Sequence, residues 1–454
     1  MRGLQAVGHF LTCDAGASHM LGRHLTIALG CCLAQFVVAT SLPAQALASR
    51  STGAHYELQS QGSAEEAADF LNCLEAAFPQ YAEFYGKTFK VSDKALLRVY
   101  FYETPEEWNK GMEMAGASNP GPAGGYYCWT TRAVFFYRQH SRSFTRRLML
   151  EMCAYQFWAH ASGHKRSPTP WFAKGAATLL SDHLWDGAEL KLGAPPLISL
   201  ENYAGVAKSR IATPKFDYRS ILNSVTREDT AVHLAAIRLI LSDPAYRRAM
   251  LGIRPSLDKG AKISAEEWSA AFGPYKRFED KLIESVIANQ EPFAVGHMDW
   301  EGRRADRDEK TGETSYQLLG QAPWVSAARC SGEVKHLECS VAFPEEGGRA
   351  GLLLDWIGPT DYQAFLVARS GDWVIQRNSP NGWTPITQGK LTNFGPANRT
   401  LSMRVERIEA ADGTLTVRVS AAGTSLAEGL VRNCYFGVIL DNGRYEFRNI
   451  RMSK

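Results

Sequence analysis

Two short segments near the middle of the chain place charged side chains within largely apolar sequence. The first, Arg147–Gln156, holds Glu151, and the second, Pro168–Gly175, holds Lys174. A carboxylate in such surroundings can act as a general acid or base. It can also be structural, forming a buried ion pair with the lysine ammonium. We prefer the ion pair and keep residual acid–base chemistry at Glu151 as the alternative.

Several histidines after the first segment have a spacing that could suit metal ligands. His160 and His164 are four residues apart, and Asp182 and His183 come soon after. The Ser-Gly pair at 162–163 is expected to end the helix between the first two histidines, so they need not share a face. No glutamate lies between them. We therefore interpret these histidines as surface or capping residues rather than as metal ligands.

Both charged segments are expected to be helical. Apolar residues recur at helical spacing over 141–161, and Ser143 can cap the first turn. A second helix is predicted over 170–184, opened by Pro170. The carboxylate and the ammonium would then lie on consecutive helices.

This layout, with Pro-Trp-Phe-x-x-Gly at 170–175, resembles the thermolysin-like gluzincin zinc peptidases over roughly residues 55–292. In that superfamily the two histidines of H-E-x-x-H and a glutamate on a following helix hold zinc. The glutamate between the histidines is the general base. The resemblance is closest to a secreted branch whose members carry H-E-x-x-H followed by W-x-x-E-G.

Carried over residue by residue, the resemblance puts Leu150 and Ala154 at the two histidine positions. Lys174 takes the position of the glutamate ligand, and Glu151 that of the general base. Leucine and alanine offer a metal no lone pair, and a lysine ammonium repels a cation. No metal and no other cofactor is therefore expected, although the family binds zinc. The resemblance implies a pseudo-peptidase that has lost zinc and catalysis.

The first 48 residues are typical of a secretory signal peptide. An apolar run from 25 to 40 follows Arg23, and the small-x-small rule predicts cleavage near Ala48. Met20 is an alternative start. No later segment is apolar and long enough to span a bilayer. We therefore expect a secreted or periplasmic protein.

Export implies an oxidising compartment in which cysteines can pair. Cys330 and Cys339 are candidates for a short disulfide-closed loop, and the other pairings stay open. Cys153 is expected to be a buried thiol rather than a nucleophile. The cysteines that follow the predicted signal peptide are Cys73, Cys128, Cys153, Cys330, Cys339 and Cys434.

The composition and the periodicity of apolar residues predict a two-domain α+β protein. The chain holds 50 basic and 47 acidic side chains without a basic stripe, which gives nucleic-acid binding no support. Helical spacing prevails up to about Pro292, and strand-like alternation follows it. We therefore predict a gluzincin-like domain over 53–292, with a small mixed sheet and helices, and an all-β sandwich over 295–454.

Within 53–292, a capping-box pattern at 63–66 and Thr104-Pro105 each predict a helix start. Residues 96–102 and 133–137 read as strands. An open sheet edge near 126–129 would bind an extended peptide by strand addition. The candidate binding residues of this part are Tyr126, Trp129 and Trp171.

Residues 295–454 alternate with period two. The segments 400–406 and 414–420 flank an Asp412-Gly413 hairpin turn. Together with the closing strands they resemble concanavalin A-like, laminin-G-type jelly rolls, folds that often bind sugars or proteins on one sheet face. Trp356, Trp373 and Trp383 are candidates for stacking on sugar rings, with core packing as the alternative. No facing carboxylate pair of the glycosidase type is found.

Three functions fit these observations. The preferred one is an exported, catalytically silent peptidase-like protein that binds a peptide, protein or glycan at the cell surface or in the periplasm. The second is a carbohydrate-binding or carbohydrate-active protein that works through its sandwich. The third is a residual hydrolase that uses Glu151.

Overall fold

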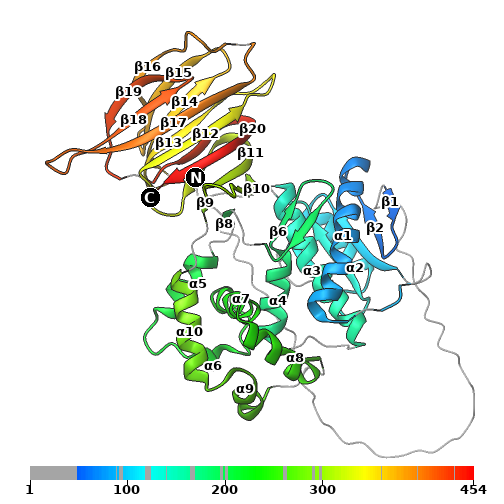
Figure 1. Ribbon diagram of the computed structural model, residues 1–454. Helices are drawn as coiled ribbons and strands as arrows, with labels where there is room; N and C mark the ends of the chain where they lie inside the picture. The colour runs from blue at the N-terminus through cyan, green and yellow to red at the C-terminus, as the bar shows by residue number, and fades with distance from the viewer. Residues whose placement is uncertain are drawn as a thin grey trace, which may run out of the picture.

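The computed structural model covers most of the chain that follows the predicted signal peptide (Figure 1). The predicted signal peptide, with Arg23, Met20 and Ala48, lies outside the described residues, as do His164 and Cys434. The described residues run from 49 to 453, without 88, 92–95, 118–123, 140, 164–168, 195–197, 200–202, 259–262, 289–291, 296–298, 359, 396 and 434.

The first region is a mixed sheet with helices packed against it. Its strands are β1 (Ser49–Thr52), β2 (Tyr56–Ser60), β3 (Leu97–Tyr102), β4 (Gly125–Cys128) and β5 (Ala133–Tyr137), and its helices are α1 (Ala64–Tyr85), α2 (Pro105–Met114) and α3 (Arg142–Ser162). The strand order is β1-β2-β3-β5-β4. Strand β3 is parallel to β2 and β5, whereas β1 and β4 are antiparallel edge strands.

The helix ends of this region follow local capping rules. Ser63 and Thr104 cap α1 and α2, as predicted, because each hydroxyl accepts a hydrogen bond from the backbone N–H three residues on. Helix α3 is capped by Ser141 and not by the predicted Ser143, which is buried in the first turn. It ends at Gly163, which takes a left-handed φ of 68°.

The second region is helical. Its helices are α4 (Pro170–Ser181), α5 (Tyr203–Ile211), α6 (Tyr218–Ile221), α7 (Arg227–Ser242), α8 (Pro244–Asp258), α9 (Ala265–Phe272) and α10 (Tyr275–Ala288), and a hairpin of β6 (His183–Trp185) and β7 (Leu190–Leu192) follows α4. Helix α4 packs between α3 and α7. It stops short of the predicted 184 because the chain turns at Asp182 into β6. One apolar core, from Tyr56 to Val286, serves both regions.

The third region is a curled antiparallel sheet. Its elements are β8 (Ile198–Ser199), β9 (Phe293–Val295), β10 (Trp300–Arg307), β11 (Thr314–Cys330), β12 (His336–Ala342), β13 (Arg349–Gly358), β14 (Asp361–Ala368), β15 (Asp372–Ser379), β16 (Gly382–Lys390), β17 (Thr400–Glu409), β18 (Leu415–Ala421), β19 (Thr424–Leu430) and β20 (Gly437–Ser453). Among the described strand pairs of this sheet, only the short β8–β9 pair is parallel.

The long strand β20 joins the two layers of this sheet. Its first half pairs with β13 and its second half with β12, which gives the order β16-β15-β14-β13-β20-β12-β17-β18-β19. A second apolar core lies between the layers. The predicted α+β fold with a jelly-roll-like β part is thus confirmed, and so is the β17–β18 hairpin at Gly413. The gluzincin assignment and the domain limits at 292–295 stay predictions.

The cysteines of the described residues are unpaired and buried. Cys153 is fully buried, as expected, and burial raises its pKa well above the usual value. The predicted Cys330–Cys339 disulfide is wrong, because the strands that carry these residues, β11 and β12, both pair with β20 rather than with each other. The sulfur of Cys330 instead lies 3.0 Å from that of Met452. No helix among the described residues is long and apolar enough to cross a bilayer.

Candidate functional site

The residues that the gluzincin resemblance assigns to its zinc site lie on the internal faces of α3 and α4. Leu150 and Ala154 are fully buried, while Glu151 and Lys174 are 8% and 9% exposed. The two helices pack against each other, so four residues that lie up to 24 positions apart in sequence belong to one buried layer.

Tyr155 interacts with both charged groups of this layer. The ammonium nitrogen of Lys174 lies 5.8 Å from the centroid of the Tyr155 ring. Burial raises the pKa of the Tyr155 phenol well above its usual value, and the negative charge of Glu151 raises it further. Both Glu151 and Lys174 interact with other residues of the protein. Both side chains are buried in this structure.

Zinc does not fit the residues that stand here. Among the four residues only Glu151 offers an oxygen donor, and a lysine ammonium stands at the position that the gluzincin resemblance assigns to the third ligand. Within the described part of the chain, no three His, Cys, Asp or Glu side chains gather as metal ligands would.

The neighbouring histidines are packed and neutral. His160 stacks on Phe89 with ring centroids 5.7 Å apart, and burial lowers its pKa to about 4. Nδ1 of His183 lies 2.8 Å from the Ser181 carbonyl oxygen, and burial lowers the His183 pKa to about 3. Neither is the exposed or helix-capping residue that the sequence led us to expect.

The other candidates in the first two regions pack inside the fold. Trp171 is 2% exposed and meets Trp268 edge to face, so it belongs to the core and not to a binding surface. Trp129 is half-buried against Tyr127. Tyr126 lies half-buried on β4, which is an edge strand as the strand-addition idea requires.

Figure 1 shows β13, β14, β15 and β16 side by side in the sandwich. A row of ring-bearing and amide side chains crosses these four strands. Cross-strand register places Trp356 opposite Tyr362, Tyr362 opposite Asn378, and Asn378 opposite Trp383. Three inter-strand steps of ~4.8 Å make this row roughly 14 Å long. We call these four residues the aromatic row.

The rings of the row contact one another. Trp356 and Tyr362 stack with centroids 5.3 Å apart and planes 23° apart, and Trp383 meets Tyr362 edge to face at the same distance. Burial raises the Tyr362 pKa to about 12, and a hydrogen bond from Asn378 acts in the opposite direction. Tyr362 is therefore a neutral, fixed centre, and Trp383, at 37% exposed, presents its ring to solvent.

The row lies on the sheet face that points away from the sandwich core. Its neighbours on that face include Leu353, Ala364 and Leu366, which form a small cluster of their own. The side chain of Trp373 lies on the opposite face of the sheet, where it packs on Phe365 against the main core. This position favours core packing over sugar stacking for Trp373. Tyr362 was not among the residues predicted from the sequence. Its alternate spacing with Ala364 and Leu366 could have indicated that the three residues share one face of a strand.

A polar network fixes one end of the row. Asn433 accepts a hydrogen bond from the Trp356 backbone N–H at 3.2 Å and donates one to the Trp356 carbonyl at 2.7 Å. Asp361, next to Tyr362, binds the Arg432 guanidinium through two contacts of 2.8 and 2.9 Å. Hydrogen bonds from Arg432, and the charge of Arg377, lower the Asp361 pKa to about 2. The aromatic row therefore lies on a preorganised support.

No family model and no curated protein matches this chain. Among solved structures it is similar to the carbohydrate-binding module CBM66 from Bacillus subtilis, with 11% identity over 34% of this chain and 96% of that chain and a TM-score of 0.26. It is also similar to the Caenorhabditis elegans galectin LEC-6, with 14% identity over 30% and 92% and a TM-score of 0.23. The GH43 BlXynB protein from Bacillus licheniformis gives 12% identity over 34% and 36%, with a TM-score of 0.23. Each of these three matches covers about a third of this chain.

Proposed function

We propose that this protein is an exported glycan-binding protein whose sandwich takes a sugar chain along the aromatic row. The observation that carries the proposal is the register that brings Trp356, Tyr362 and Trp383 together on the outer sheet face. Export rests on the signal-peptide pattern of residues 1–48.

The chemistry of the row suits a sugar. A pyranose has an apolar C–H face that is released from water when it covers an aromatic ring, and hydroxyls at its rim that need hydrogen-bond partners. The half-buried Trp356 and the exposed Trp383 supply rings. Asn378 supplies an amide between them. Rings and amides held by neighbouring strands lose little conformational entropy on binding, which favours affinity.

The glycan test uses the full chain on an array of neutral oligosaccharides, followed by calorimetry with the best probe. We expect Trp383→Ala to weaken binding about tenfold or more, because truncation of an aromatic hot-spot contact costs about 2 kcal/mol or more and about 1.4 kcal/mol is tenfold in affinity. Leu251→Ala is the control, since it removes another exposed apolar side chain, 63% exposed, from α8 in the helical region. Equal binding by Trp383→Ala and wild type would refute the proposal, as would an array without neutral ligands.

For the first two regions we propose a catalytically silent, gluzincin-like scaffold rather than a peptidase. The supporting observation is that Leu150, Ala154 and Lys174, which the resemblance assigns to the ligand positions, are buried and offer no donor set for zinc. A residual hydrolase that relies on Glu151 finds less support, because this carboxylate is enclosed beside Tyr155 and Lys174. Catalytic silence is tested by peptidase assays of the full chain with and without added zinc.

A further inference from the structure

A cavity of about 540 Å³ lies where the start of α3 meets the third region. The first turn of α3 and the β6–β7 hairpin form one wall, and strands β10, β11 and β20 form the other. Among the described residues, five arginines and four carboxylates line it. We call it the junction cavity. Its volume is in the range of small-molecule sites, which is roughly 300–1,000 Å³.

The N-terminus of α3 lies in the wall of the junction cavity, because Ser141 and Arg142 both line it. Helix α3 has 21 residues, and its cap, Ser141, accepts a hydrogen bond from the Phe144 N–H. The backbone N–H groups of Arg142 and Ser143 have no partner within the described part of the chain. Such N–H groups and the positive end of the helix dipole together attract anions.

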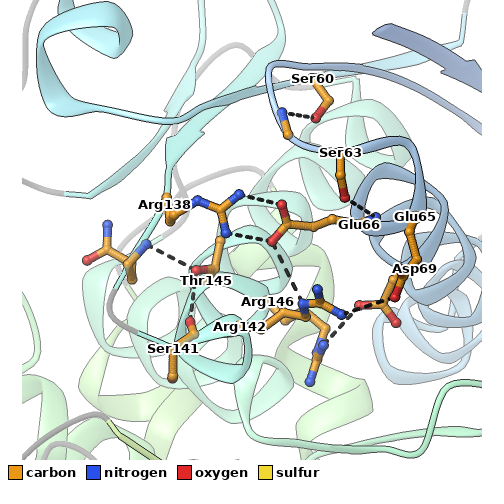
Figure 2. A network of polar contacts seen from close by, with 12 residues as sticks. Ser60, Ser63, Glu65, Glu66, Asp69, Arg138, Ser141, Arg142, Thr145 and Arg146 are labelled. Carbon is orange, nitrogen blue, oxygen red and sulfur yellow. Dashed lines mark hydrogen bonds and ion pairs between the residues drawn. The ribbon is translucent and has the colours of Figure 1, made fainter. Parts of the chain in front are cut away.

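A buried arginine follows one turn further along α3. Arg146 has a side chain that is only 3% exposed, and its guanidinium binds Asp69 of α1 at 2.9 Å and Glu301 of β10 at 2.7 Å. Figure 2 shows Arg146 beside Asp69, with Arg142 in the same network. The buried Nε of Arg146 has no hydrogen-bond partner among the described residues, whereas buried donors almost always have one. This donor is a second sign, independent of the helix end, that the cavity wall suits an acceptor.

The four carboxylates of the cavity are already engaged by the protein. Asp69 and Glu301 both bind Arg146. Asp186 accepts hydrogen bonds from two backbone N–H groups of its own turn, which lower its pKa. Asp299 accepts one from an indole N–H at 2.9 Å. These contacts offset the negative charge of the cavity and favour an anionic over a cationic ligand.

Three arginines of the cavity retain guanidinium donors for a ligand. Arg142 lies 3.8 and 4.0 Å from its nearest carboxylate oxygens, and Arg303 lies 3.7 Å from its own. These separations are too long for hydrogen bonds. Arg444 is exposed and forms no ion pair or hydrogen bond within the described part of the chain. An incoming anion can therefore accept charge-assisted hydrogen bonds from them.

The donors of the cavity come from three separate elements, namely α3, β10 and β20. A carboxylate has two oxygens, whereas the oxyanion of a phosphate or sulfate ester has three terminal ones. A tetrahedral oxyanion can therefore meet the helix end and the arginines of both strands at once. The amides of Gln139 and Gln321 also line the cavity, which suits a hydroxylated remainder of the ligand.

We propose that the junction cavity binds a small hydroxylated ester of phosphate or sulfate. Its oxyanion lies between the N-terminus of α3 and the guanidinium groups of Arg303 and Arg444. The phosphate and sulfate forms share this chemistry. The inference concerns a site separate from the aromatic row, and it does not rest on the proposed glycan binding.

The test measures calorimetric binding of glycerol 3-phosphate and of glycerol 3-sulfate to the full chain, with glycerate and glycerol as the carboxylate and neutral comparisons. We expect one or both esters to bind more tightly than the comparisons, and raised salt to weaken that binding. Arg303→Gln and Arg444→Gln should each weaken it about tenfold, the size expected for one charge-assisted hydrogen bond. The matched control is Arg248→Gln, because Arg248 of α8 is also exposed and forms no ion pair within the described part of the chain.

Hydrogen exchange tests where the oxyanion binds. The bound ester should slow amide exchange at Arg142 and Ser143, because their N–H groups then gain an acceptor. Exchange around Arg248 in α8 should not change. Mass spectrometry of the full chain with and without the ester measures both.

Several results would overturn the inference. These are no binding of either ester, equal affinity for glycerate, unchanged binding by both Arg303→Gln and Arg444→Gln, or exchange at 142–143 that the ester does not slow. An equal loss in Arg248→Gln would also overturn it, because the ester would then respond to surface charge in general. Trp383→Ala should leave ester binding unchanged, so the failure of this site and the failure of the aromatic row are separate outcomes.

Discussion

Gly175 of α4 lies directly against the backbone of His233 in α7. A β-carbon built on Gly175 would be 2.7 Å from the carbonyl oxygen of His233 and 2.7 Å from a side-chain carbon of Ile237. The glycine that ends the Pro-Trp-Phe-x-x-Gly pattern is thus required by helix packing, independently of any metal. It lets α4, which carries Lys174, lie between α3 and α7.

Gly175→Ala is expected to destabilise the protein by about 1–3 kcal/mol or more, because the methyl group must displace helix backbone and not a flexible side chain. Thermal and denaturant unfolding measure the effect. Gly252→Ala in α8 is the matched control, since a β-carbon there meets no atom within 4 Å. Alanine should stabilise that helix by about 0.5–1 kcal/mol. Opposite signs at two helical glycines support the packing argument, and a neutral Gly175→Ala would contradict it.

Local patterns predicted much of this fold because their causes lie within a few residues. Ser63 and Thr104 cap helices through N–H groups one turn away, and a turn at Gly413 joins two strands with alternating apolar residues. Where two neighbouring residues both suit a helix cap, the predicted cap was wrong. Ser141 and Ser143 both suit a helix cap, and only the tertiary fold buries Ser143 and leaves Ser141 at the helix start.

The candidate sites could not be predicted in the same way. Alternation tells which residues of one strand share a face, but not which face meets the core. Trp373 and Trp383 therefore looked equivalent, and only the pairing of β14, β15 and β16 turns the first inward and the second outward. Irregularities along β13 also set where Trp356 meets Tyr362. Long-range contacts are equally hidden from local patterns, and the Arg146–Glu301 ion pair joins residues that lie 155 positions apart.

Lys174→Met tests the proposed ion pair with Glu151. Both side chains are under 10% exposed, so the loss of one charge should leave the other buried without its counter-charge. We expect a loss of roughly 3–5 kcal/mol in the free energy of unfolding for Lys174→Met, and a similar loss for Glu151→Gln. Denaturant unfolding at neutral pH measures both.

The double variant Glu151→Gln with Lys174→Met is the control for that ion pair. It should recover much of the lost stability, because neither buried charge is then left alone. If the double variant instead loses the sum of the two single-variant losses in unfolding free energy, the two residues interact with other partners and not with each other. An unchanged stability of Lys174→Met would contradict the ion pair itself.

Buried histidines predict that the protein loses stability in mild acid. His233 is fully buried, and burial lowers its pKa to about 4, while the hydrogen bond to the Ser224 backbone and the charge of Asp229 act in the opposite direction. The unfolded chain has the ordinary His pKa near 6.5, so between that pH and about 4 it binds more protons than the native state. The stability is therefore complete above pH 6.5 and falls as the pH drops toward 4. For a shift of this size the loss is on the order of 3 kcal/mol.

His233→Gln should flatten this pH dependence, because glutamine can still donate to the Ser224 carbonyl but does not titrate. Unfolding experiments from pH 7.5 to 4 compare the slopes for wild type and variant. At pH 7.5 the histidine is neutral, so any difference there reports packing alone. A variant with the wild-type slope would place the proton uptake on other groups, such as His160 and His183, whose pKa values burial also lowers.

The gluzincin resemblance predicts that three substitutions can create a zinc site in this protein. Leu150→His, Ala154→His and Lys174→Glu together would supply two imidazoles and a carboxylate from the facing helices α3 and α4. Three such ligands with an open fourth position are the usual catalytic zinc set. We expect the triple variant to bind about one zinc per chain, measured by metal analysis after dialysis, and its melting temperature to rise with zinc because the metal binds the folded state.

The variant with only the two histidines is the matched control for the zinc experiment. It keeps the lysine ammonium at the third position, so it should bind zinc far more weakly, and the difference isolates the charge at residue 174. Histidines placed at fully buried positions will lower the stability of both variants, so circular dichroism must first show that each is folded. A folded triple variant without zinc affinity would mean that residues 150, 154 and 174 do not converge as gluzincin ligands do, and the peptidase ancestry proposed for this region would then fail.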